Sequence, residues 1–79
     1  MSKQAEFLAR IQKAAEDADF DLRELKFYND MYPKMKILTR SNQDRVEHAI
    51  AAVGLKLDKI IEEHSENGKN VFFLVFPRI

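Results

Sequence analysis

The sequence predicts an α+β fold with the element order α-β-β-α-β-β, in which two helices pack on a four-stranded antiparallel sheet. Two segments have apolar residues at helical spacing, and each is followed by two strand-like segments joined by a turn. Only two glycines and two prolines occur among the 79 residues, and each lies at an expected boundary. We expect a single domain over residues 1–79, near the lower size limit for one hydrophobic core.

The first helix is expected from Ser2 to Ala18. Ser2 is the expected N-cap, because its hydroxyl can accept a hydrogen bond from a free amide of the first turn. Charged residues lie on one side of this helix, and the apolar residues fall on a single arc of the other side. The apolar residues are Phe7, Leu8, Ile11, Ala14, Ala15 and Ala18.

Two strands, 20–28 and 33–40, should follow, joined by a turn in the sequence NDMYP. The apolar alternation of the first strand changes phase between Leu22 and Leu25. Either the strand begins late or a β-bulge shifts its phase. The second strand begins with a proline, which favours an edge position at its start.

The second helix is expected to begin at Ser41, since Ser41 and Asp44 have the spacing of a capping box. Gly54 is the expected left-handed residue that ends it. The apolar residues with helical spacing are Val46, Ala49, Ile50 and Val53.

The second hairpin is expected from strands Leu55–His64 and Lys69–Phe76. Between them, Asn67 and Gly68 tolerate the positive φ angles of a type I′ turn. Pro77 should end the last strand.

The last strand is apolar on both faces, which is unusual for a small sheet with one face in water. We expect Val71, Phe73 and Val75 to face the helices. The other face could be covered by a helix on that side, by long lysine side chains, or by a second subunit or partner. The candidate protein interface comprises Leu38, Phe72, Leu74 and Phe76.

Basic and aromatic residues alternate along the first hairpin. Such a surface can contact a phosphate backbone and stack on bases, although lysines also commonly cover a solvated edge strand. The candidate nucleic-acid contacts are Lys26, Tyr28, Tyr32, Lys34, Lys36, Arg40 and Arg45.

Composition limits the remaining function classes. Thirteen basic and thirteen acidic residues give a neutral chain, which argues against a general polyanion binder but allows a local basic patch. The chain has no cysteine, no Gly-rich phosphate loop and no paired acid and base, so we expect neither an enzyme nor a cofactor or metal site. We interpret the acidic sequence EEHSE as a solvated hairpin tip. Without a signal peptide or spanning segment, we expect a cytoplasmic protein with no membrane contact.

Four stretches together resemble a known family: FDLRELKFYNDMY, MKIL, AVGLKLDKI and NGKNVFFLVF. They are similar to the C-terminal, double-wing DNA-binding domain of the MotA family of phage middle-promoter activators, over about residues 15–78. The family domain is basic and has an extra hairpin before its second helix and a final helix, which this chain lacks. The resemblance implies a phage or mobile-element origin and a protein that binds host machinery.

These observations predict a small non-catalytic regulatory protein that contacts nucleic acid through a basic sheet surface. The alternative is a protein-binding module or an inhibitor of a host protein that uses the apolar face of the last strand. In this alternative the same face could also join two copies of the chain into a homodimer.

Overall fold

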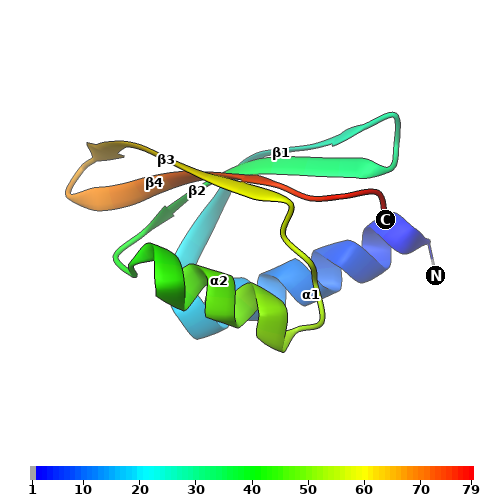
Figure 1. Cartoon of the computed structure of the whole chain (residues 1–79), viewed down its shortest axis with the longest axis horizontal. Helices are drawn as coiled ribbons and strands as arrows, with labels where there is room; N and C mark the ends of the chain where they lie inside the picture. The colour runs from blue at the N-terminus through cyan, green and yellow to red at the C-terminus, as the bar shows by residue number, and fades with distance from the viewer. Residues whose placement is uncertain (1) are drawn as a thin grey trace.

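The computed structural model describes residues 2–79 and confirms the predicted α+β fold and element order (Figure 1). The sheet is antiparallel throughout with the strand order β1-β2-β4-β3, so the last strand is central. Both helices lie on the same face of this sheet (Figure 1), which excludes helices on opposite faces. The elements are α1 (Lys3–Ala18), β1 (Phe20–Tyr28), β2 (Tyr32–Thr39), α2 (Gln43–Ala52), β3 (Lys59–Glu66) and β4 (Lys69–Val75).

Each helix begins at a side-chain cap, one of which differs from the prediction. Ser2 caps α1 as expected, and its hydroxyl accepts the amide of Ala5 at 3.1 Å. The cap of α2 is Asn42, whose side chain accepts the amide of Arg45 at 2.8 Å. The prediction of Ser41 is therefore wrong by one residue. The Ser41 hydroxyl instead donates to a backbone carbonyl at the end of α1, at 2.6 Å.

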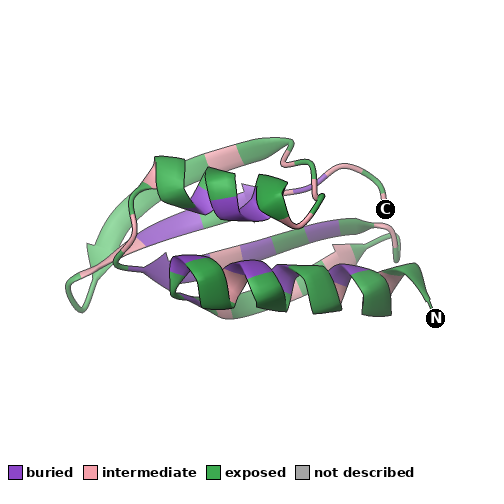
Figure 2. Ribbon diagram, turned by 90° about the horizontal axis from the view of Figure 1, so that it is seen from below, coloured by how far each residue is buried: buried purple, intermediate pink, exposed green. Residues whose placement is uncertain are grey.

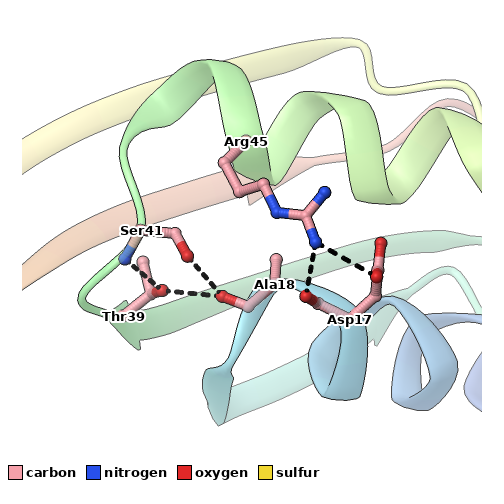
Figure 3. Close-up of polar contacts among 5 residues, drawn as sticks. All are labelled: Asp17, Ala18, Thr39, Ser41 and Arg45. Carbon is pink, nitrogen blue, oxygen red and sulfur yellow. Dashed lines mark hydrogen bonds and ion pairs between the residues drawn. The ribbon is translucent and has the colours of Figure 1, made fainter.

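The C-terminal end of α1 is held by side chains from β2 and α2 (Figure 3). The hydroxyl of Thr39, which is only 1 % exposed, lies 3.2 Å from the carbonyl oxygen of Ala18 and 3.1 Å from that of Asp19. Arg45 donates to the carbonyl oxygen of Asp17 at 2.8 Å and to its carboxylate at 3.1 Å. These bonds satisfy carbonyl groups that a helix end leaves without intrahelical partners.

A β-bulge accounts for the phase change in β1. The register shifts between Arg23 and Lys26, and Glu24 has a φ of 49°. This confirms the bulge and excludes a late strand start. The type I′ turn is also confirmed, since Asn67 and Gly68 have φ angles of 51° and 76°.

The third strand begins four residues later than predicted and runs two residues further. Leu55 and Leu57 lie in a loop between α2 and β3, where both are partly buried against the core. Their apolar spacing therefore reflects contact with the core and not strand pairing. Pairing with β4 begins where the amide of Asp58 donates to the carbonyl of Val75 at 2.9 Å.

The core fills the space between the helices and the sheet, and Figure 2 shows buried stretches where these layers face each other. On β4 the helix-facing side chains are Phe72 and Leu74, and Phe76, one residue beyond the end of the strand, faces the same way; all three are at most 2 % exposed. The prediction that Val71, Phe73 and Val75 face the helices is thus wrong. The phase of β4 is set by its pairing with β2, which places Phe72 beside Ile37 and Leu74 beside Met35. Phe76 then reaches the ring of Phe7 on α1, with centroids 5.0 Å apart.

Candidate nucleic-acid interface

The sheet face opposite the helices, called the outer face below, is where the basic residues gather. Side chains of paired residues in an antiparallel sheet point to the same side, so the register arranges them in rows across the four strands. One row comprises Lys26, Lys34, Val75 and Lys59, and the next comprises Arg23, Lys36, Phe73 and Ile61.

One half of the outer face is covered by ion pairs. Leu38 and Val71 are 8 % and 1 % exposed, although neither belongs to the core beneath the helices. Two ion pairs reach across the strands above them, Lys36–Glu66 at 2.6 Å and Lys69–Asp21 at 3.2 Å. Lysine side chains therefore cover apolar surface with their methylene groups while their charged ends are paired, which is one of the alternatives expected for this face.

The Lys36–Glu66 pair is the best-formed of these contacts. The hydrogen bond that the Lys36 ammonium donates to the carboxylate of Glu66 raises the pKa of Lys36 above its ordinary value of 10.5, and desolvation opposes this shift only in part. A second carboxylate, that of Glu24, lies 3.9 Å away. The charge of Lys36 is thus already compensated within the protein.

The other half of the outer face is exposed and both basic and aromatic. We call this surface the basic aromatic patch; it comprises Lys26, Tyr28, Tyr32, Lys34, Lys59 and Phe73. Its rings are the most exposed aromatic side chains of residues 2–79: Tyr28 is 49 % exposed, Tyr32 40 % and Phe73 36 %. A shallow depression of about 120 Å³ is lined by Phe73, Tyr28, Met35 and the three lysines of the first hairpin, Lys26, Lys34 and Lys36, and by Glu24. Residues from β1, β2 and β4 therefore form one continuous surface.

Within the patch, Lys34 is held over a tyrosine. Its ammonium nitrogen lies 4.8 Å from the centre of the Tyr28 ring, which is the geometry of a cation–π contact. One face of Tyr28 is thus occupied, whereas no such contact is formed with Tyr32 or Phe73 among the residues described. Tyr28 therefore positions a lysine, and the other two rings remain open for stacking.

The structure brings together most, but not all, of the predicted nucleic-acid contacts. Lys26, Tyr28, Tyr32, Lys34 and Lys36 share the outer face. Arg40 is exposed just beyond the opposite end of β2, about 20 Å from Lys34 at the usual rise of a strand. Arg45 lies on α2, in the layer behind the sheet, and is bound to Asp17.

Two members of the patch were not predicted, Lys59 and Phe73. Lys59 lies on the strand whose start was misplaced, and Phe73 was assigned to the core. The alternation of β4 contained the signal for Phe73, but the sequence does not show which phase of the strand faces the helices.

The predicted protein interface does not form an open surface. Phe72, Leu74 and Phe76 are buried beneath the helices, and Leu38 is covered on the outer face. The apolar side chains that are exposed on the sheet are instead Phe73 and Ile61, which are paired neighbours on β4 and β3 and are 36 % and 44 % exposed.

Two further findings concern residues 2–79. No three acidic, histidine or cysteine side chains lie close enough together to hold a metal ion. Neither helix has the length and apolarity needed to cross a membrane.

Comparison with known proteins gives no relative: no family model, curated protein or solved structure matches this chain. The resemblance to the MotA-family domain therefore stays a prediction.

Proposed function

We propose that this protein is a small non-catalytic binding protein that contacts nucleic acid through the basic aromatic patch. The observation on which this depends is the row that places Lys26, Lys34 and Lys59 across the sheet, beside exposed aromatic rings. Lysine ammonium groups neutralise phosphates, and aromatic rings stack on bases whatever their sequence.

The neutral net charge is compatible with this proposal because three lysines lie in one row of the outer face, while the carboxylates on this face are bound to other lysines: Glu66 and Glu24 to Lys36, and Asp21 to Lys69. No acidic side chain occurs in the row of lysines. The helices carry exposed charges of both signs: the acidic residues are Glu6, Glu16, Asp17, Asp44 and Glu47, and the basic residues are Lys3, Arg10, Lys13 and Arg45. A local basic surface on a neutral protein restricts phosphate contact to one face.

The test is binding of fluorescein-labelled DNA and RNA, single-stranded and duplex, followed by fluorescence anisotropy as the salt concentration rises. We expect binding at about 50 mM salt that weakens steeply towards about 200 mM. The double substitution Lys26→Gln and Lys34→Gln should weaken binding and make the plot of log affinity against log salt shallower by about 1.4, the slope of two single-strand phosphate contacts.

The matched control removes the same charge elsewhere. Lys13 on α1 and Lys56 in the loop after α2 are exposed and lie outside the patch. Their double substitution by glutamine should leave the affinity and the salt slope unchanged. Equal losses in both double variants, or no binding at low salt, would exclude the patch as a nucleic-acid surface.

A second candidate function is supported by the exposed pair of Phe73 and Ile61, which could contact a protein partner or a second copy of this chain. Sedimentation equilibrium measures the mass in solution and so shows whether two copies of the chain associate. A dimer that the substitution Ile61→Lys dissociates would favour this alternative, whereas a monomer would leave the nucleic-acid proposal as the better account of the face.

A further inference from the structure

The width of the sheet limits which nucleic acid can reach the centre of the patch. Four strands at about 4.8 Å spacing are about 14 Å wide between the outer strand axes, before side chains are added. The major groove of B-DNA is about 12 Å wide. The major groove of an undeformed B-DNA duplex can therefore not admit the whole sheet, and its bases do not reach a residue on a central strand.

Phe73 is such a residue. It lies on β4, between Lys36 on β2 and Ile61 on β3, so strands flank it on both sides. Its ring is 36 % exposed, and no other aromatic ring lies over it within residues 2–79. An unpaired base can turn its flat face to the sheet and stack there without the unstacking and bending that a duplex would need.

A second exposed ring, that of Tyr32, lies far enough from Phe73 for one strand of nucleic acid to stack a base on each. Tyr32 is four residues along β2 from Lys36, the neighbour of Phe73, which puts Tyr32 about 14 Å from Phe73. The row containing Lys26, Lys34 and Lys59 crosses the sheet between these two rings. Bases stacked at both ends would place the intervening phosphates beside the lysines.

We infer that the ligand of the patch is single-stranded nucleic acid, which crosses the outer face with one base stacked on Phe73 and another on Tyr32. This inference depends on the proposed function and adds the ligand class. It assigns Phe73 as the main stacking platform and Lys34, held by Tyr28, as a phosphate contact.

The first test uses the absence of tryptophan from the chain. The variant Phe73→Trp has one tryptophan, on the patch, and its fluorescence should be quenched when oligothymidylate or oligouridylate of about 15 nucleotides is added. The matched control is Ala9→Trp, since Ala9 is exposed on α1, away from the outer face. Its fluorescence should not change.

The second test measures affinity by anisotropy with the same labelled strands and with a DNA duplex of equal length. Phe73→Leu keeps an apolar side chain but removes the ring, and should weaken single-strand binding by about 5- to 150-fold. Phe73→Tyr keeps the ring and should bind as the wild type does. Circular dichroism confirms that each variant is folded before binding is compared.

The outcomes distinguish failure of this inference from failure of the proposed nucleic-acid function. Tighter binding of DNA or RNA single strands than of duplex, with quenching in Phe73→Trp, supports the inference. Duplex binding of equal or higher affinity, or an unchanged affinity in Phe73→Leu, overturns the inference while the nucleic-acid function stands. Failure of every strand to bind at low salt overturns both.

Discussion

Phe72 and Phe73 are adjacent on β4 but lie on opposite faces, so their substitution by alanine tests the orientation of the sheet. Phe72 is 1 % exposed beneath the helices, and its truncation removes a buried ring and leaves a cavity. Such changes cost about 3–5 kcal/mol of unfolding free energy. Phe73 is 36 % exposed on the outer face. Full burial of a phenylalanine side chain contributes about 1.5–3 kcal/mol to the unfolding free energy, so the buried part of Phe73 contributes about 1–2 kcal/mol. Its truncation leaves no closed cavity.

The assay is urea unfolding followed by circular dichroism. A domain of this size has a net stability of roughly 3–5 kcal/mol, so Phe72→Ala should be largely unfolded without urea, whereas Phe73→Ala should keep a cooperative transition at a lower midpoint. Both variants lose the same strand propensity, and their difference therefore isolates burial. Equal destabilisation, or a larger loss in Phe73→Ala, would refute the assigned faces.

Three other substitutions test the local contacts. Thr39→Val keeps the shape of the side chain but removes the hydroxyl beside the carbonyl of Ala18, and should lower the unfolding free energy by about 1–3 kcal/mol; an unchanged urea midpoint would contradict this. Glu66→Gln removes the partner that raises the pKa of Lys36. Since a raised lysine pKa stabilises the fold below the unfolded value of 10.5 and is lost as the pH rises through the folded value, the wild type should lose more thermal stability than this variant above pH 10.5, and parallel losses would count against the pair. Asp19, at the end of α1, has a φ of 53°, which glycine adopts without the steric cost of a Cβ atom. Asp19→Gly should therefore raise the unfolding free energy by about 1 kcal/mol. A lower melting temperature would show that the left-handed conformation is not strained.

The local structure could be predicted because it is encoded in short-range patterns. The helical arcs, the Ser2 cap and the Asn67-Gly68 turn each depend on residues within a few positions of one another. The change of phase in the first strand is visible in the same way; it leaves two explanations, a late strand start or a bulge, and the structure shows the bulge, at Glu24.

What the sequence did not show depends on contacts between distant segments. The alternation of β4 is equally apolar in both phases, so only its pairing with β2 decides that Phe72 faces inward. The start of β3 was misplaced because Leu55 and Leu57 have strand spacing but pack against the core from a loop. These choices are made by tertiary packing and not by local propensity.

The candidate site was predicted in part for the same reason. Lys26 and Lys34 are brought together by one hairpin, and their pairing follows from the turn between the strands. Lys59 joins them from the far edge of the sheet through two further pairings, which the sequence does not reveal. Arg45 was a plausible phosphate contact by charge alone, but its bond to Asp17 holds it on the opposite side of the molecule.

The central claim is that nucleic acid binds the outer face of the sheet, and it is tested most directly by NMR. Amide chemical shifts of the ¹⁵N-labelled protein would be compared with and without oligothymidylate. We predict that the perturbed amides lie around Lys26, Lys34, Lys59 and Phe73, while those of α1 and α2 stay in place. Perturbations confined to the helices, or none at low salt, would contradict the account.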